Sequence, residues 1–214
     1  MNTGKCREEW EKAYNNASFY QSRQSTIAYW NEVAGKGGAG LAGTEHLKLL
    51  EKLLNNCGVL DGTKTMLDVG CGTGDYELYY SRFFKTITAN DNAEIMIEKC
   101  KNNCDMNGLD NVEFCVADYK SLDESKKYDV VFACLNPSTY CPEGLEKLLE
   151  LSSGIVVYLS MNTSLEGCDR EPVYRGTNSV VFAEEYLKER GIEYLKEAFI
   201  YADKIPFAYL IVKK

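Results

Sequence analysis

The sequence predicts an α/β protein with a mostly parallel sheet and a helical segment in front of it. From residue 64 onward, short apolar runs typical of buried strands alternate with segments of helical periodicity. Such alternation indicates right-handed crossovers between parallel strands. The last two expected strands are joined by only a few residues around Pro206, and so short a link requires an antiparallel hairpin.

The individual elements follow from the spacing of the apolar residues. Three helices are expected before residue 60, and Thr44 is a possible N-cap of the third, whose apolar face starts at Leu47. Helices are expected at 7–20, 24–34, 44–56, 75–84, 93–106, 142–152 and 182–190. Strands are expected at 64–69, 86–91, 111–117, 127–134, 154–160, 193–201 and 206–213.

Composition restricts the classes of partner. The 214 residues carry a formal net charge of -8, and the sequence contains no basic stripe that would overcome repulsion from phosphate backbones. A small molecule or another protein is therefore favoured over nucleic acid. No apolar run reaches the length of a membrane helix, and the first residues lack the apolar stretch of a secretory signal. We expect a cytoplasmic protein without a membrane partner.

The nine cysteines are expected to be reduced thiols, most of them buried. Cys100 and Cys104 would share one face of a helix, but no C-x-x-C pair occurs, and His46 is the only histidine. We therefore expect no metal site. A single histidine without a G-x-S-x-G motif also disfavours a hydrolase triad.

Two glycine clusters could hold a ligand. GKGGAGLAG (35–43) follows an expected helix and not a strand, which is typical of a connection or a hinge and not of a phosphate loop. In MLDVGCGTGDY (66–76), an expected strand runs directly into Gly70, Gly72 and Gly74, and a helix begins near Asp75. Ligands of open α/β sheets bind beside such a strand-to-helix turn.

The acidic residues around the second cluster indicate the kind of ligand. Dinucleotide-binding loops carry glycine where this chain has Asp75, and a carboxylate there would repel a pyrophosphate. Asp68 and Asp75 bracket the loop with negative charge, which suits a cation. Asp91 ends the second strand and can accept hydrogen bonds from ribose hydroxyls. A ribose combined with a cation indicates S-adenosylmethionine.

Four segments, in order, resemble the motifs of class I S-adenosylmethionine-dependent methyltransferases: MLDVGCGTGDY, ITANDNAEIMIEKC, FCVADY and YDVVFACLNPS. The resemblance runs from about residue 44 to the end. It implies a Rossmann-like seven-stranded sheet of order 3-2-1-4-5-7-6 with strand 7 antiparallel. It also divides the chain into an N-terminal helical cap (1–43) and a methyltransferase domain (44–214), because WNEVA resembles the cap of small-molecule members.

The resemblance also implies roles for single residues. The glycine loop would lie against the methionine moiety, Asp68 would reach its ammonium group, and Asn136 would lie near the transferring methyl. Asp91 would hold the ribose, and Asp118 would accept from the adenine amino group beside Tyr119. As alternatives, the two acids could be ordinary exposed residues, and Tyr119 could pack in the core. The expected cofactor-binding residues are Asp68, Gly70, Cys71, Gly72, Gly74, Asp91, Asn92, Asp118, Tyr119 and Asn136.

The expected acceptor is a small molecule, bound by a monomer or homodimer. The cap aromatics Tyr14, Tyr20, Tyr29 and Trp30 are expected to cover the acceptor as a lid hinged at GKGGAGLAG. NPSTY (136–140) partly resembles the N-P-P-Y box of N-methyltransferases. One alternative is therefore an amine or amide N-methyltransferase that acts on a protein or nucleobase through Asn136-Pro137. Another is a cofactor-binding module without turnover.

Two side chains are candidate general bases for an acceptor that must lose a proton. They are Tyr140, the aromatic residue of the NPSTY segment, and His46, which opens a helix and is expected at the surface. Asn136 and Tyr140 are the expected catalytic residues.

Overall fold

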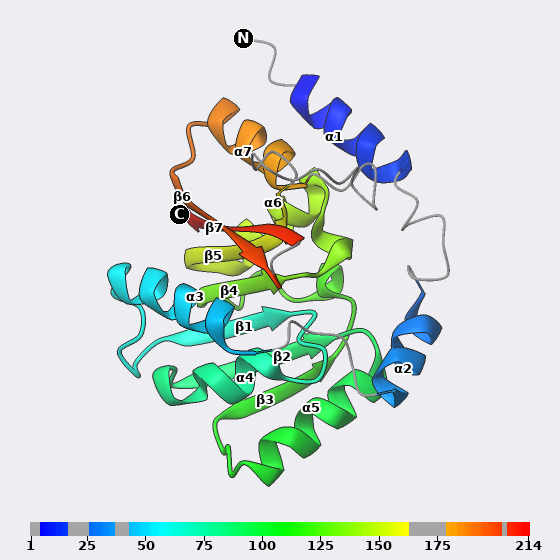
Figure 1. Ribbon diagram of the computed structural model, residues 1–214, viewed down its shortest axis with the longest axis vertical. Coiled ribbons are helices and arrows are strands. Elements are labelled where there is room, and N and C mark those ends of the chain that lie inside the picture. The colour runs from blue at the N-terminus through cyan, green and yellow to red at the C-terminus, as the bar shows by residue number, and fades with distance from the viewer. Residues whose placement is uncertain (1–4, 17–25, 37–42, 163–178, 203–204) are drawn as a thin grey trace.

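The computed structural model describes residues 5–16, 26–36, 43–162, 179–202 and 205–214. Its centre is a seven-stranded sheet in the order β3-β2-β1-β4-β5-β7-β6 (Figure 1). β7 runs antiparallel to both of its neighbours, and the other strands pair in parallel. The strand order and the antiparallel strand 7 expected from the sequence are therefore confirmed.

The elements agree with the expected ranges to within a few residues. The strands are β1 (Thr65–Val69), β2 (Thr86–Asp91), β3 (Val112–Val116), β4 (Tyr128–Cys134), β5 (Ser152–Met161), β6 (Tyr194–Tyr201) and β7 (Ile205–Lys213). The helices are α1 (Lys5–Asn16), α2 (Ile27–Gly35), α3 (Glu45–Asn56), α4 (Asp75–Tyr80), α5 (Glu94–Met106), α6 (Pro142–Leu151) and α7 (Ser179–Glu189). Short 3-10 turns are η2 (Ser81–Phe83), η3 (Tyr119–Ser121) and η4 (Pro137–Thr139).

Two details of the expected elements were wrong. The helix expected at 75–84 leaves α geometry at Tyr80 and continues as the 3-10 turn η2. The hairpin link was expected around Pro206, but β7 already begins at Ile205, and Pro206 lies inside it opposite Ile200. Its carbonyl accepts a hydrogen bond from the Asn162 backbone N–H (2.9 Å). A proline is tolerated there because it is the second residue of the strand, where few ladder bonds are lost.

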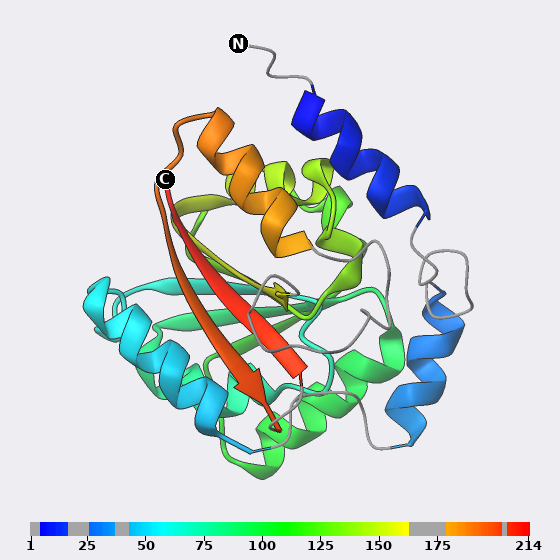
Figure 2. The same ribbon diagram turned by 45° about the horizontal axis from the view of Figure 1, so that its top comes forward.

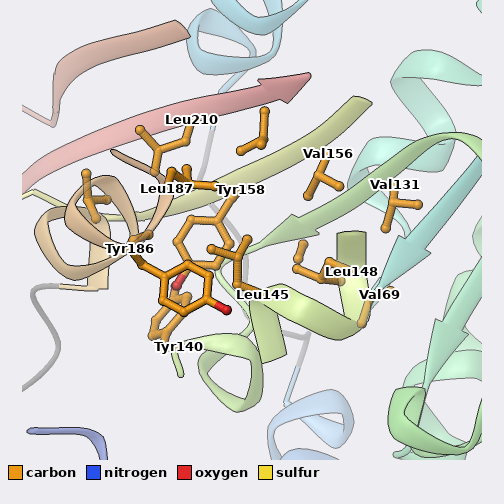
Figure 3. Close-up of a cluster of buried hydrophobic side chains, with 14 of the residues drawn as sticks. Val69, Val131, Tyr140, Leu145, Leu148, Val156, Tyr158, Tyr186, Leu187 and Leu210 are labelled. Carbon is orange, nitrogen blue, oxygen red and sulfur yellow. The ribbon is translucent and has the colours of Figure 1, made fainter. Parts of the chain in front are cut away.

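Helices cover both faces of the sheet, and side chains of one strand alternate between the two faces. Met66 packs with Leu50 and Leu54 of α3 and with Tyr80 of α4. Leu67 belongs to the opposite cluster, which includes residues of α1, α6 and α7. Figure 3 shows part of this second cluster, where Tyr140, Tyr158 and Tyr186 gather with Leu145 and Leu187. The near-continuous apolar runs of the central strands follow from burial on both faces.

Helix α1 belongs to this second core, because Trp10 anchors it there. The Trp10 side chain is 1% exposed, stacks on Phe182 and meets Tyr186 edge-on. Its indole N–H donates to the Tyr140 carbonyl (2.9 Å). Arg7 adds an ion pair to Glu146 of α6 (2.6 Å). The first helix of the expected cap is therefore packed against α6 and α7.

Helix α2 packs on a different part of the protein. Trp30 and Val33 contact Ala93 and Met96 at the start of α5, and the Asn31 side chain accepts from the Ile95 N–H (3.2 Å). In Figures 1 and 2, α1 and α2 lie along one side of the molecule, the side towards which β1 and β2 point in Figure 1. The division of the chain at residue 43 stays a prediction, and residues 37–42 of the expected hinge lie outside the described residues.

We predict that Trp10→Phe lowers the free energy of unfolding by about 1–3 kcal/mol, because the buried Tyr140 carbonyl loses its donor. Urea unfolding measures this change. Trp30→Phe is the matched control, since Trp30 is only half-buried on α2, and it should cost less. Equal stabilities of Trp10→Phe and the wild type would show that the indole bond does not hold α1.

Candidate active site

The glycine loop lies at the point where the sheet order reverses. From β1 the chain moves outward to β2 and β3, and it then returns to β4 on the other side of β1. A crevice forms at such a switch point, outside the carboxyl ends of the strands. Residues 70–74 occupy this position, between the end of β1 and the start of α4.

Two of the loop glycines could not be replaced without strain. Gly70 has φ +82° and Gly74 has φ +96°, values that residues with a Cβ rarely adopt. A Cβ on Gly70 would lie 2.6 Å from the Asn136 amide nitrogen, and one on Gly74 would lie 2.8 Å from the Cys100 sulfur. The loop is therefore held between the segment after β4 and helix α5.

Asp91 fastens the loop from the end of β2. One carboxylate oxygen accepts from the Gly72 N–H (3.2 Å), and the other accepts from the Ala93 N–H (2.8 Å). Burial raises the pKa of Asp91, and these two N–H donors oppose that rise. The structure thus brings Asp91 to the loop, as its position in the sequence predicts, while the neighbouring Asn92 is exposed.

A second buried acid, which the sequence analysis missed, accompanies Asp68. Glu77 of α4 is 0% exposed and Asp68 is 1% exposed, and their carboxyl groups lie next to each other. Among the described residues, no N–H or O–H group donates to either oxygen of Glu77 or to Oδ2 of Asp68. The burial of Glu77 could have been predicted from the sequence, because Glu77 lies three residues before the buried Tyr80 and shares the inward face of α4 with it.

The pair holds a proton at neutral pH. Burial raises the pKa of Asp68 to about 7, and the negative charges of Asp91 and Asp75 add to this rise. Burial and the neighbouring Asp68 raise the pKa of Glu77 well above its usual range. Two adjacent carboxyl groups in a dry site cannot both ionise cheaply. The site therefore favours a positive charge, either a proton or a cationic ligand.

Asn136 connects the segment after β4 to the end of β1. Its amide N–H donates to the Val69 carbonyl (3.0 Å), and its side-chain oxygen accepts from the Ser138 N–H (3.2 Å) and hydroxyl (2.6 Å). Leu135 just before it has φ +56°, a strained value for a branched residue. These contacts give Asn136 a structural role at the loop, and its expected role near the methyl stays a prediction.

Tyr140 points into the core. Its ring is buried beside Tyr158, with 5.7 Å between ring centroids (Figure 3), and its hydroxyl donates to the Leu159 carbonyl (3.2 Å). Burial raises the pKa of this phenol further above its usual value of 10. The hydroxyl therefore has a structural partner, and its high pKa opposes proton transfer at neutral pH.

Asp118 and Tyr119 have different surroundings. Asp118 is exposed, and it caps the turn η3 by accepting from the Lys120 N–H (3.0 Å). The Tyr119 ring is buried in the core cluster, and its hydroxyl donates to the Ser138 carbonyl (3.0 Å). Asp118 is thus accessible to a ligand, whereas Tyr119 packs in the core, the alternative raised from the sequence.

The expected lid aromatics flank the site from two sides. Tyr14 of α1 packs against the core cluster, and its hydroxyl donates to the Ser138 carbonyl (3.4 Å). On α2, Tyr29 meets Trp30 edge-on at 5.2 Å, and Trp30 packs beside Ala93, two residues after Asp91. Tyr20 lies outside the described residues. Their role in covering an acceptor stays a prediction.

His46 was expected at the surface, and the structure corrects this expectation. The side chain is buried because the start of α3 packs against α4 and β6, with the rings of Tyr76 and Tyr201 at 6.4 and 6.5 Å. Burial lowers the pKa of His46, and nearby Asp75 partly opposes this. Within the described residues its Nδ1 has no hydrogen-bond partner. His46 is therefore a neutral imidazole at neutral pH.

A glycine loop lies at the switch point of a mainly parallel sheet and is bracketed by carboxylates, which is the arrangement in which Rossmann-like folds bind nucleoside cofactors. A family described as "Methyltransferase domain" matches residues 60–192. The chain belongs to this family. None of the helices in the described residues is both long and apolar enough to cross a bilayer.

Solved structures of other methyltransferases share the fold. Magnesium protoporphyrin IX methyltransferase from Synechocystis, solved with bound S-adenosylhomocysteine, has a TM-score of 0.64 and 14% identity. The match covers 92% of this chain and 97% of that chain. An S-adenosylmethionine-dependent methyltransferase from Aquifex aeolicus has a TM-score of 0.55 and 21% identity over 76% and 88% of the two chains. At these identities the likeness shows the fold alone.

Sequence relatives include an uncharacterised RNA methyltransferase of Listeria innocua, 32% identical over 112 residues. The match covers 50% of this chain and 24% of that relative. The chain thus corresponds to about a quarter of the length of the curated relatives it matches.

We predict that the Asp68–Glu77 pair makes the protein less stable as pH rises. The folded pKa of Asp68 is about 7, against an ordinary value of 3.8, so between these values the folded state binds more protons than the unfolded state. Stability therefore falls as pH rises through this window. Urea unfolding at pH 5 and pH 8, with a metal chelator present, measures the fall.

Glu77→Gln should reduce this fall, because the variant lacks the second buried acid, whose own pKa is raised by burial and by Asp68. Glu98→Gln, an exposed acid of α5, is the control and should follow the wild type. A Glu77→Gln protein that loses as much stability as the wild type between the two pH values would contradict the shared proton.

Proposed function

We propose that this protein is an S-adenosylmethionine-dependent methyltransferase that acts on a small-molecule acceptor. The observation that carries the proposal is the negative charge of the exposed residues around the cofactor loop, Asp75, Glu94 and Asp118. Lys120, the lysine nearest to Asp118 in sequence, is paired with Glu143 (2.9 Å). The net charge of -8 adds to the repulsion of a phosphate backbone, which RNA-binding surfaces normally neutralise with Lys and Arg.

The residues around the loop fit the cofactor. No N–H or O–H group in the described residues donates to Oδ2 of the buried Asp68, so a cationic ammonium near it, directly or through water, would relieve an unfavourable burial. We propose that Asp68 faces the ammonium, Gly70, Gly72 and Gly74 the methionine chain, Asp91 the ribose and Asp118 the adenine. When bound, S-adenosylmethionine supplies a methyl group on a positively charged sulfur.

The residues of the chain would contribute to methyl transfer by aligning the cofactor with the acceptor. In methyl transfer a lone pair of the acceptor attacks the methyl carbon in line with the breaking carbon–sulfur bond, and holding both reactants in place supplies up to about 7–11 kcal/mol of the barrier reduction. The clamp from Asn136 to the Val69 carbonyl and the bond from Gly72 to Asp91 fix the two sides of the loop. A fixed loop supports such alignment.

His46 fits the role of general base better than Tyr140 for an acceptor that must lose a proton. Its imidazole is neutral, and Asp75 lies near enough to stabilise its charged form. Tyr140 already donates to Leu159. We propose His46 as this base.

The second candidate is an RNA or protein amine acceptor, favoured by the name of the Listeria innocua relative and by the partial likeness of NPSTY to an N-methyltransferase box. Release of S-adenosylhomocysteine separates the candidates when the enzyme is offered small amines, thiols and phenols, total RNA, or protein extract. Turnover with a small acceptor that is insensitive to salt supports the proposal. Turnover with RNA alone overturns it, and no turnover with any acceptor favours a binding module.

We predict that Asp91→Ala weakens S-adenosylhomocysteine binding by about 1.5–3 kcal/mol, the range for hydrogen bonds to a charged group. The lost carboxylate would have held both the ribose and the Gly72 N–H. Calorimetry measures the affinity, and Asp105→Ala, an exposed acid at the end of α5, is the control. Unchanged affinity in Asp91→Ala would remove Asp91 from the cofactor site.

We predict that His46→Gln lowers turnover by about a hundredfold or more with an acceptor that must be deprotonated, while S-adenosylhomocysteine affinity stays unchanged. In the wild type, the rate should fall as pH drops below the lowered pKa of His46, because the imidazole then binds a proton, and the variant should lack this fall. Tyr140→Phe tests the other candidate. Loss of turnover in Tyr140→Phe but not in His46→Gln would make Tyr140 the base.

A further inference from the structure

Three elements bring potential metal ligands together behind the cofactor loop. Cys71 belongs to the loop, Glu77 to α4 and Cys100 to α5, and one ligand atom from each lies within 4.8 Å of the other two. All three side chains are buried. Cys104, one helical turn after Cys100 and also buried, has its thiol next to that of Cys100.

Glu77 is the independent sign that something belongs in this cluster. A fully buried carboxyl group whose polar partner is another acid, Asp68, is costly, and no N–H or O–H group of the described residues donates to either of its oxygens. The rest of the surroundings are apolar, with Ala89, Ile97 and Phe114 packed around the thiols. The cluster thus offers sulfur and oxygen ligands in a site closed to water.

The backbone is shaped to let the thiols approach. Gly74 has no Cβ, and a Cβ there would lie 2.8 Å from the Cys100 sulfur. Cys100 and Cys104 are four residues apart on α5, so their side chains lie on one face of the helix. Ligands around a tetrahedral zinc ion, at about 2.0–2.3 Å from the metal, stand roughly 3.3–3.8 Å apart. The three clustered ligand atoms would need to move closer together, and the Cys104 sulfur, which lies outside their 4.8 Å group, would need to move further to reach this geometry.

We propose that Cys71, Glu77 and Cys100 bind a zinc ion, and that Cys104 moves in beside Cys100 as the fourth ligand. Thiolate sulfur and carboxylate oxygen are both common zinc ligands, and four-coordinate sites without water are typical of structural zinc. Thiolates select zinc over magnesium or calcium, which prefer oxygen. The ion would tie the cofactor loop to α4 and α5.

Zinc binding releases the protons of the ligand groups to solvent. Zinc displaces the thiol protons of Cys71, Cys100 and Cys104, and the proton of Glu77, so four protons pass to solvent and no oxidant is needed.

The expectation of no metal site rested on the absence of a C-x-x-C pair. Cys71 and Cys100 are 29 residues apart in sequence, and only the fold brings them together. This proposal does not depend on the identity of the methyl acceptor.

Cobalt tests the site, because it takes the place of zinc and absorbs light in the near ultraviolet when thiolates bind it. The full-length chain is reduced, freed of metal with a chelator, and titrated with Co²⁺ until absorption is constant. We expect one Co²⁺ per chain with a thiolate-to-cobalt band that zinc abolishes. Calorimetry of zinc binding in buffers of different ionisation enthalpy should show the release of protons.

Variants locate the ligands. Cys100→Ser should lose most of the thiolate band, and Glu77→Gln should weaken zinc binding by at least about tenfold, the smallest loss expected when a group supporting a metal is removed. Cys6→Ser, which removes a buried thiol of α1 that contacts α7, is the matched control and should bind like the wild type.

Two results would overturn the site. One is a wild-type chain without a thiolate band at saturating Co²⁺. The other is a band and a zinc affinity that stay unchanged in both Cys100→Ser and Glu77→Gln. If circular dichroism shows that Cys100→Ser does not fold, Glu77→Gln decides alone, because glutamine keeps the shape of the side chain and removes only its charge.

Discussion

The structure depends on the close meeting of three chain segments around the loop after β1. The loop can lie there only because Gly70 and Gly74 have no side chains, since a Cβ on either would clash with Asn136 or Cys100. Asp91 and Asn136 then hold the two sides of the loop with hydrogen bonds to Gly72 and to the Val69 carbonyl. A bare backbone fixed in this way is what a nucleoside cofactor needs for close contact. This arrangement depends on the strand order, on the positions of Asp91 and Asn136, and on the packing of α5.

Electrostatics give the site its preference for cations. Asp68 and Glu77 are buried side by side, and Asp75 and Asp91 add negative charge nearby. Natural proteins rarely bury carboxyl groups without compensation. The two ends of this acidic region face different surroundings, since Asp68 belongs to β1 beside the loop, whereas Glu77 faces the thiols of Cys71 and Cys100. One region can therefore serve a cofactor on one side and a metal ion on the other.

The helices before the sheet are built into the body of the protein. Trp10 joins α1 to the core cluster formed with α6 and α7, and Trp30 joins α2 to the start of α5. These anchors place Tyr14 beside the segment after β4 and Trp30 beside the segment after Asp91. The two helices are therefore fixed to the body of the protein at two separate points.

The sequence by itself determined the class of fold, the strand order implied by the family motifs, the glycine loop and the acid at the end of β2. It could do so because these features are local: a period of apolar residues, a strand that runs into glycines, an aspartate at a strand end. Only the tertiary structure decided that His46 is buried, that Tyr140 points into the core, and that Glu77 lies against Asp68. It alone brought Cys71 to Cys100. Burial and proximity between residues far apart in sequence depend on how the helices pack on the sheet, and no local pattern of residues records that packing.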